Sequence, residues 1–238
     1  MSLSGKVAIV TGGTGGSGKA VILELAKKGA KVTTTYIYHH ELESLQKEAP
    51  PELLKTIAIS KTDVLKQEEV EKLVADVAKE HGRIDILVNL VGGYMGGVNL
   101  HESEEKTWDL MLELNLRSAY HCCKAVIAHM ISQKYGKIVS VSARTGLEPS
   151  AGDAAYAVAK AGVIVLARAL SEEVKLSNIN VNAILPSVID TEANRHDMPD
   201  EDFSLWVKPE EIARVIAFLV SDDASAITGA AIPVYGKS

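Results

Sequence analysis

The sequence lacks several features typical of secreted, membrane-bound or nucleic-acid-binding proteins. Its two cysteines in 238 residues, Cys122 and Cys123, are adjacent, which favours packing over a disulfide framework or a metal site. No apolar stretch is expected to reach a membrane span, and the first residues do not form a signal peptide. The formal net charge is -6, and no long basic run is present. We therefore expect a cytoplasmic protein that binds a small-molecule substrate, with no metal and no nucleic-acid or membrane partner.

The remaining composition fits one α/β domain, because 47% of the residues are hydrophobic and the chain is long enough to bury a substantial core. Short apolar runs predict strands at Val7–Val10, Val32–Ile37, Leu54–Ile59, Ile84–Asn89, Lys137–Ser142, Asn178–Leu185 and Ile232–Tyr235. Helical patterns lie between them, at Ala20–Ala26, Gln67–Lys79, Thr107–Met130, Ala154–Leu176 and Pro209–Val220. This alternation predicts a single-domain Rossmann fold over residues 1–238: a doubly wound parallel sheet of about seven strands with helices on both faces.

A glycine-rich turn follows the first strand and precedes the first helix. It reads Thr11-Gly-Gly-Thr-Gly-Gly-Ser-Gly18. Glycines permit a tight turn, and the helix that follows offers unpaired amides and a positive dipole to a pyrophosphate. Gly12, Gly16 and Gly18 are therefore assigned to a dinucleotide, together with the flanking Thr11 and Ser17.

The end of the second strand lacks the acidic residue that often binds the adenosine ribose in such folds. Tyr36 stands there instead, followed by Ile37, Tyr38, His39 and His40. A 2'-phosphate would meet no repelling carboxylate at this position, yet no arginine follows to attract it. The histidine pair could contact a phosphate, although solvated surface histidines are the commoner case. The cofactor is therefore NAD or NADP, with the preference open.

Two polar groups in the expected helix at Ala154–Leu176 form a candidate acid/base device. Tyr156 and Lys160 are four residues apart, so they share one helix face. A neighbouring cation favours the phenolate form of a tyrosine and brings its pKa closer to neutrality.

A second glycine-rich turn, at residues 89–97, follows the fourth strand at the sheet edge where open α/β folds bind ligands.

These motifs, in this order and spacing, resemble the short-chain dehydrogenases/reductases over nearly the whole chain. The motifs are the Thr11–Gly18 turn, Asp63-Val64, Asn89-x-x-Gly92, Asn115 and Tyr156-x-x-x-Lys160. The resemblance implies that Tyr156 exchanges a proton, that Lys160 lowers its pKa and holds the nicotinamide ribose, and that Asn115 supports a water-mediated proton relay. It further implies a cofactor site that includes Tyr36, Asp63, Val64, Asn89, Gly92 and Pro186.

The sequence departs from this family at one position. The family usually has a serine thirteen residues before the catalytic tyrosine, where its hydroxyl polarises the substrate carbonyl, and here that position holds Ala143. Ser142 is adjacent, but successive strand residues point to opposite faces. Ala143, the Gly92-Gly-Tyr-Met-Gly-Gly97 turn and the 185–206 segment resemble the dihydropteridine reductases, a divergent branch. That resemblance implies a quinonoid substrate, whereas the N-terminal half is more similar to the ketoacyl reductases.

We predict an NAD(P)-dependent oxidoreductase that acts on a small carbonyl or quinonoid substrate. The alternative is a catalytically weak nucleotide-binding regulatory protein on the same fold, which Ala143 favours and the Tyr156–Lys160 pair opposes. Residues 187–207 are polar and contain proline, which suggests a short substrate lid. The family resemblance also implies a homodimer or homotetramer, with the long helices paired across an interface.

Overall fold

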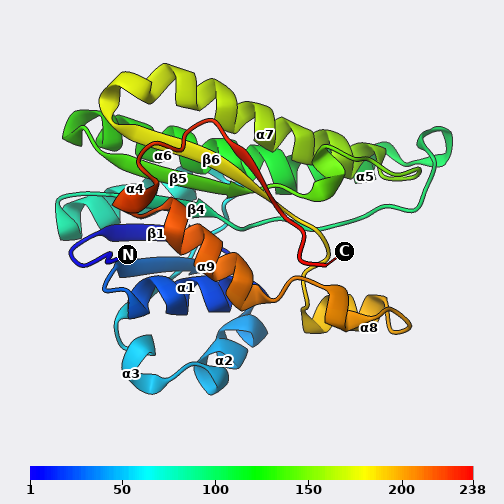
Figure 1. Ribbon diagram of the computed structural model, residues 1–238, viewed down its shortest axis with the longest axis horizontal. Helices are drawn as coiled ribbons and strands as arrows, with labels where there is room; N and C mark the ends of the chain where they lie inside the picture. Colours follow the sequence, from blue (N-terminus) through cyan, green and yellow to red (C-terminus); the bar gives the residue numbers. More distant parts are fainter. Residues whose placement is uncertain (238) are drawn as a thin grey trace.

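The computed structural model describes residues 1–237, which form one parallel seven-stranded sheet with helices on both faces (Figure 1). The strand order is β3-β2-β1-β4-β5-β6-β7. The order reverses beside β1, and in open α/β sheets this topology places a ligand crevice at the carboxyl ends of the strands. The predicted doubly wound Rossmann fold is confirmed. The strands are β1 (Val7–Thr11), β2 (Lys31–Tyr36), β3 (Ile57–Lys61), β4 (Ile86–Asn89), β5 (Gly136–Val141), β6 (Ile179–Pro186) and β7 (Ala231–Val234).

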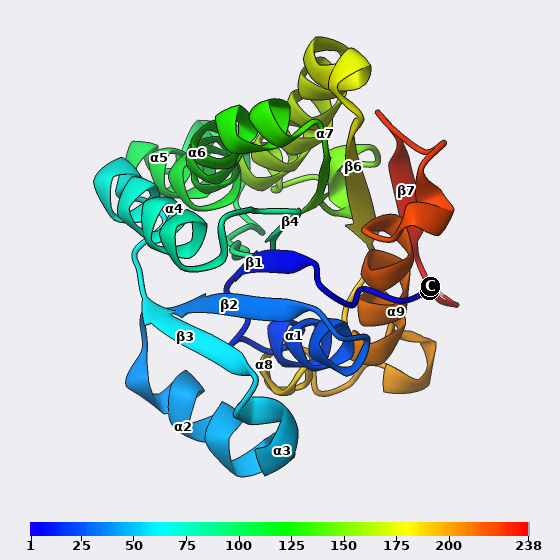
Figure 2. The same cartoon turned by 90° about the vertical axis from the view of Figure 1, so that its left-hand side faces the viewer.

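Helices cover both faces of the sheet (Figure 2), and a hydrophobic layer holds them on each face. Because successive strand residues point to opposite faces, Ala8 and Val10 enter one layer while Val7 and Ile9 enter the other. The first layer packs α1 (Gly18–Lys27) and α9 (Pro209–Leu219), and the second packs α4 (Gln67–His81), α6 (Ser118–Gln133) and α7 (Ala154–Val174). The other α-helices are α2 (His39–Glu48), α3 (Pro51–Leu54), α5 (Glu105–Leu112) and α8 (Glu192–Asp197).

The predicted third strand, Leu54–Ile59, was placed too early. Pro51 occupies the start of α3, where its missing N–H and fixed φ suit a helix, and that helix continues through Leu54. The strand therefore begins only at Ile57 and extends to Lys61. The last strand differs in the opposite direction, because it begins one residue earlier than predicted, at Ala231.

The predicted helix Thr107–Met130 is interrupted. Between α5 and α6 the chain forms a wide π-helical turn over Glu113–Arg117, and Asn115 lies inside it. Such turns occur frequently at functional sites, because they redirect side chains out of the regular helical register. The Asn115 side chain therefore leaves the helix in a direction that differs from that expected in an uninterrupted α-helix.

Helix α7 also corrects the expectation that no segment approaches the length of a membrane span. By length and mean hydropathy alone, Ala154–Ser177 could cross a membrane. It packs instead against the second hydrophobic layer through Ile164 and Ala167, and it buries the charged Lys160. Its apolar character therefore matches a helix that covers the sheet.

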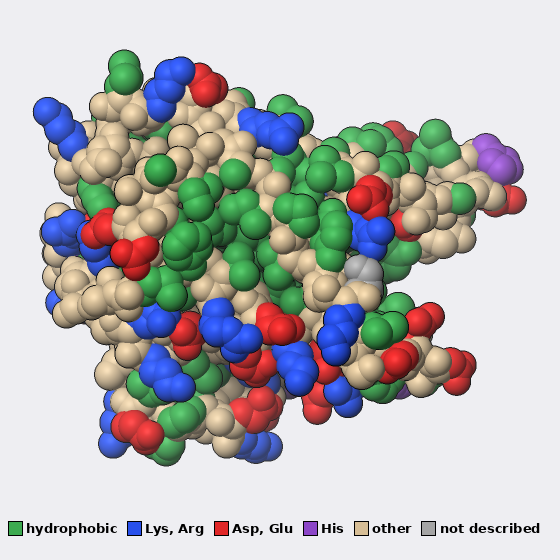
Figure 3. Space-filling view, in the orientation of Figure 1, with side chains coloured by type: hydrophobic (Ala, Val, Ile, Leu, Met, Phe, Trp, Pro, Cys, Tyr) green, Lys and Arg blue, Asp and Glu red, His purple; other side chains and the backbone are tan. Residues whose placement is uncertain are grey.

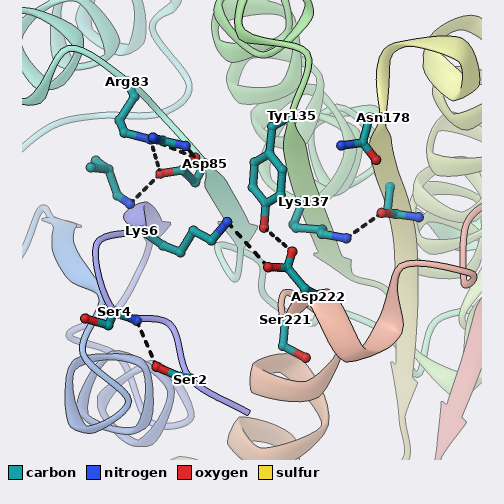
Figure 4. A network of polar contacts seen from close by, with 12 residues as sticks. Ser2, Ser4, Lys6, Arg83, Asp85, Tyr135, Lys137, Asn178, Ser221 and Asp222 are labelled. Atoms are coloured by element: carbon teal, nitrogen blue, oxygen red, sulfur yellow. Dashed lines mark hydrogen bonds and ion pairs between the residues drawn. The ribbon is translucent and has the colours of Figure 1, made fainter.

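A polar network joins the amino-terminal ends of the strands (Figure 4). The buried Asp85 carboxylate accepts hydrogen bonds from the Val7 amide at 2.9 Å and from the Arg83 guanidinium at 2.6 Å. Nearby, the Tyr135 hydroxyl donates to Asp222 at 2.8 Å, and Lys6 forms an ion pair with the same carboxylate at 3.7 Å. The network fixes the start of β1 beside β4, at the end of the sheet opposite the glycine turn.

Replacing Asp85 by alanine should lower the free energy of unfolding by about 2 kcal/mol, because it leaves the buried Val7 amide without its acceptor. Chemical denaturation followed by circular dichroism measures this. Asp76→Ala is the matched control, since that carboxylate is 62% exposed and pairs with Lys72 on the surface. Equal losses in the two variants would contradict a structural role for Asp85.

Candidate active site

The glycine turn is tied to β2 by two hydrogen bonds. The Gly12 amide donates to Thr35 Oγ1 at 3.0 Å, and the Gly13 amide donates to Thr34 Oγ1 at 3.1 Å. A Cβ atom on Gly18 would lie 2.2 Å from the Gly12 carbonyl oxygen, so only glycine fits there. This tight closure brings the N-terminus of α1 to the carboxyl end of β1. The turn thus fits a dinucleotide pyrophosphate.

The segment 187–207 lies against this turn. A Cβ atom on Gly16 would lie 2.9 Å from the Thr191 side chain, and Thr191 caps α8 by accepting a hydrogen bond from the Asn194 amide at 3.2 Å. Pro186 ends β6 just before this segment, beside Val234 of β7. Sequence reasoning did not single out Thr191, because a threonine in a polar segment carries no signal until its partner is known.

Asn115, Gly92 and Lys160 come together although they are far apart in the sequence. A Cβ atom on Gly92 would lie 2.7 Å from Asn115 Oδ1 and 3.0 Å from Lys160 Nζ. Asn115 also holds the neighbouring Gly93, because Oδ1 accepts from the Gly93 amide at 3.1 Å and Nδ2 donates to the Gly93 carbonyl at 3.0 Å. Gly92 therefore lets the two side chains approach each other.

Burial and a nearby carboxylate raise the pKa of Tyr156. Its ring meets that of Tyr94 edge to face, with centroids 5.1 Å apart, and the Tyr94 hydroxyl donates to Asp153 Oδ1 at 2.8 Å. Desolvation, followed by the charge of Asp153 and then by Tyr94, raises the pKa of Tyr156 to about 12. Tyr94 and Asp153 were not among the predicted site residues, and only the glycine-rich setting of Tyr94 pointed to this region.

The expected lowering of the Tyr156 pKa by Lys160 does not arise in this arrangement. Lys160 is only 5% exposed, and its Nζ donates to the Val141 carbonyl at 3.0 Å. That nitrogen lies 5.6 Å from the centroid of the Tyr156 ring. Burial lowers the pKa of Lys160 itself to about 8. The ammonium group is therefore held at the end of β5, beside Gly92.

Ser142 does not take the place of the missing serine. Its hydroxyl is buried and donates to the Lys160 main-chain carbonyl at 2.7 Å, which ties the end of β5 to α7. A serine hydroxyl has one proton, so this bond leaves none for a substrate. Ala143 follows in an extended conformation and contributes only a methyl group.

The other predicted cofactor residues follow the carboxyl ends of the strands. Thr11 Oγ1 accepts from the Leu90 amide at 3.2 Å, which joins β1 to the chain after β4. Asn89 donates to Ser140 Oγ at 3.0 Å, and its Oδ1 is, within residues 1–237, a buried atom without a hydrogen-bond partner. Ser17 precedes α1 without a side-chain capping bond.

Tyr36, Asp63 and Val64 lie towards the β3 edge of the sheet. Tyr36 ends β2, and its ring meets His39 edge to face with centroids 5.8 Å apart. Asp63 Oδ1 accepts from the Leu65 amide at 3.0 Å, and the carbonyl of the buried Val64 contacts His121 Nδ1 at 3.2 Å. These contacts fix the loop between β3 and α4.

An apolar arm borders the site. Residues 94–102 project from the molecule after β4 (Figure 1). Met95, Val98 and Leu100 on this arm are exposed. A pocket of about 340 Å³ lies at its base, between the arm, α5 and the start of α7. The space-filling view shows a hollow between the arm and the lobe that carries α8 (Figure 3). The hollow provides room for a substrate next to the cofactor crevice.

Neither cysteine belongs to this site as a reactive group. Cys122 and Cys123 are free and buried, and burial raises the pKa of the Cys123 thiol to about 11. Within residues 1–237 no group of three or more His, Cys, Asp or Glu side chains is arranged to hold a metal ion.

Comparison with known families agrees with this geometry. The family model described as short chain dehydrogenase matches residues 6–202. The chain belongs to the short-chain dehydrogenase family. It is therefore an NAD(P)-dependent oxidoreductase. The curated relatives from Thermotoga maritima and Thauera aromatica are a reductase and a dehydrogenase subunit, so the regulatory alternative gains no support.

Three relatives illustrate the similarity of this short-chain dehydrogenase to known proteins. The 3-oxoacyl-[acyl-carrier-protein] reductase FabG of Thermotoga maritima is 35% identical over 246 residues, covering 99% of this chain and 98% of that protein. The (2S)-[(R)-hydroxy(phenyl)methyl]succinyl-CoA dehydrogenase subunit BbsD of Thauera aromatica is 31% identical over 245 residues, covering 99% and 97%. The solved structure of ElxO with NADP bound has a TM-score of 0.88 and 28% identity, covering 97% of both chains.

The lowered pKa of Lys160 should make stability depend on pH. The folded state releases the Lys160 proton near pH 8, whereas the unfolded chain keeps it until about pH 10.5. The unfolded state therefore binds more protons between these values, and stability rises with pH there. Relative to Lys160→Met, which lacks the group, the parent should gain free energy of unfolding as the pH rises from 7 to 10.

Denaturant titrations of both proteins at several pH values measure this difference. Lys72→Met serves as the control, because the Lys72 side chain is 77% exposed. A constant difference between the parent and Lys160→Met across the range would show that Lys160 is not destabilised by burial.

Proposed function

We propose that this enzyme reduces the ketone of a 3-oxoacyl thioester, taking hydride from NADH or NADPH and a proton from Tyr156. The observation that carries the proposal is the convergence of Tyr156, Lys160 and the Asn115–Gly92 contact beside the glycine turn. The 3-oxoacyl-[acyl-carrier-protein] reductase of Thermotoga maritima and the CoA-ester dehydrogenase of Thauera aromatica support this substrate class.

Each part of the site has a role in this proposal. A nicotinamide held in this crevice would supply the hydride for the ketone carbon. The glycine turn, from Thr11 to Gly18, binds the pyrophosphate, and Lys160 holds the nicotinamide ribose. The phenol of Tyr156 donates its proton to the ketone oxygen as the C–H bond forms. A pKa of about 12 keeps this phenol protonated at neutral pH, which suits a proton donor in reduction.

The remaining predicted residues support this arrangement. Asn115 holds the turn at Gly93, and we propose that it also orders a water molecule that returns a proton to the site. Asn89, Gly92 and Pro186 line the cofactor crevice, while Tyr36, Asp63 and Val64 border the adenosine end. We propose that residues 187–207 act as a lid, because Thr191 already lies against Gly16.

The arm supports an acyl substrate. Met95, Val98 and Leu100 are exposed on residues 94–102, next to the pocket at the base of the arm. Covering such exposed side chains with an apolar ligand is favourable, because it removes apolar surface from water. The pocket is also lined by Ala154 and Ala155, which directly precede Tyr156 in α7.

Ala143 favours a second candidate, the reduction of a quinonoid ring such as that of a dihydropterin. Loss of one preorganised donor to a developing oxyanion costs on the order of a hundredfold to a thousandfold in rate. A quinonoid ring spreads the incoming charge over conjugated atoms and so depends less on a single donor. The resemblance of the Gly92–Gly97 turn to the dihydropteridine reductases supports the same candidate.

We further propose that the enzyme acts in the cytoplasm as a homodimer or homotetramer. Apolar side chains remain exposed on the long helices, including Leu110 on α5, Tyr120 on α6 and Val165 on α7. Pairing these helices across a symmetric interface would bury them.

Tyr156→Phe should reduce turnover of acetoacetyl-CoA at least a thousandfold while changing the Kd for the reduced cofactor by less than about threefold, because it removes the acid and keeps the ring. Cofactor oxidation at 340 nm and fluorescence titration measure the two quantities. Tyr135→Phe is the matched control, since it removes a phenol at the far end of the sheet. Retained turnover in Tyr156→Phe would refute its assignment as the acid.

The same assay separates the two substrate classes. Quinonoid dihydropterin and acetoacetyl-CoA are compared by kcat/KM in the parent enzyme. A higher value for the thioester supports the first proposal, and a higher value for the pterin supports the second.

A further inference from the structure

The adenosine end of the crevice holds a carboxylate that does not come from the usual strand position. Tyr36 occupies the end of β2, but Glu41, in the first turn of α2, reaches back to the glycine turn. The hydroxyl of Thr14, a residue only 1% exposed, donates to Glu41 Oε2 at 2.9 Å. The acid missing from the end of β2 is thus supplied by the helix that follows.

The position of this carboxylate is fixed on both sides. The residues before Thr14 are held to β2, because the Gly12 and Gly13 amides donate to the hydroxyls of Thr35 and Thr34. Helix α2 follows β2 directly and lies at the edge of the sheet (Figure 2). In dinucleotide-binding folds this corner, between the glycine turn and the end of β2, receives the adenosine ribose. The bond to Thr14 uses Oε2, which leaves Oε1 for a ribose hydroxyl.

Lys19, His39 and His40 near this corner contact other side chains, and Lys61 is the cation that the test below must exclude as the determinant. Lys19 Nζ donates to Ser44 at 2.6 Å and to Glu48 at 2.8 Å. Lys61 ends β3 beside Tyr36, and its charge acts on Glu69. The rings of His39 and His40 pack against Tyr36 and Tyr38. The sequence from 12 to 48 contains no arginine, the side chain best suited to a bidentate bond with a phosphate.

We propose that Glu41 sets the cofactor preference of this enzyme in favour of NADH over NADPH. Its carboxylate accepts a hydrogen bond from the ribose 2'-hydroxyl of NADH and repels the 2'-phosphate of NADPH. The preferred cofactor of this chain would then differ from the NADP that is bound in the ElxO structure. The inference rests on the enzyme's use of a nicotinamide cofactor and not on the proposed acyl substrate.

The test is the Kd of the parent and its variants for NADH and for NADPH, measured by fluorescence titration without substrate. The parent should bind NADH at least tenfold more tightly. Glu41→Gln keeps the side-chain shape and removes the charge, so it should tighten NADPH binding about tenfold or more and change NADH binding by less than about threefold. The gain for NADPH should shrink as salt concentration rises.

Two control variants test whether the effect on the Kd ratio depends on the charge at position 41. Glu43→Gln removes an exposed carboxylate from the same helix and should leave the Kd ratio unchanged. Lys61→Gln should also leave it unchanged. Thermal melting of each variant checks that it is folded.

A parent that prefers NADPH, or a Glu41→Gln variant with the parent's Kd ratio, would overturn the inference. A loss of NADPH binding in Lys61→Gln would overturn it too, because Lys61 would then be the determinant. These outcomes are independent of the substrate. Failure to reduce acetoacetyl-CoA would refute the proposed function while leaving the Kd values to decide the role of Glu41.

Discussion

Burial of one ammonium group constrains the whole site. Lys160 lies under the end of β5, where its Nζ donates to the Val141 carbonyl, and burial lowers its pKa to about 8. Isolated buried charges are costly, so the surroundings must supply polar partners. The chain does so by ending β5 at Val141, anchoring α7 through Ser142 and bringing the Asn115–Gly92 contact to the same point. Tyr156, one helical turn earlier, is positioned by the same anchoring.

The sequence was sufficient to predict the fold class, the glycine turn after β1 and the placement of Tyr156 and Lys160 on one face of α7, because these depend on local periodicity and short spacing. Other features depend on contacts between distant segments. The π-helical turn at Asn115 leaves no clear signal in an apolar helix, and Pro51 was not recognised as the start of a helix. The Glu41–Thr14 bond joins residues 27 positions apart, which no spacing rule predicts.

The structure also sharpens what Ala143 means for the chemistry. The Ser142 hydroxyl donates to the Lys160 carbonyl, so it does not replace the hydroxyl donor that Ala143 lacks. Burial, followed by the charge of Asp153 and then by Tyr94, raises the pKa of Tyr156. A proton donor that stays protonated favours reduction, and weak polarisation of the carbonyl favours substrates that are already activated. A quinonoid ring meets that requirement more fully than the ketone of a 3-oxoacyl thioester does.

Hydride transfer from the nicotinamide to a substrate carbon is the central claim, and isotope transfer tests it most directly. The enzyme is incubated with NADH carrying two deuterium atoms at nicotinamide C4 and with acetoacetyl-CoA, and the product is analysed by mass spectrometry. The account predicts one deuterium atom at C3 of 3-hydroxybutyryl-CoA. A product without deuterium, or a cofactor that keeps both labels after prolonged incubation, would contradict it.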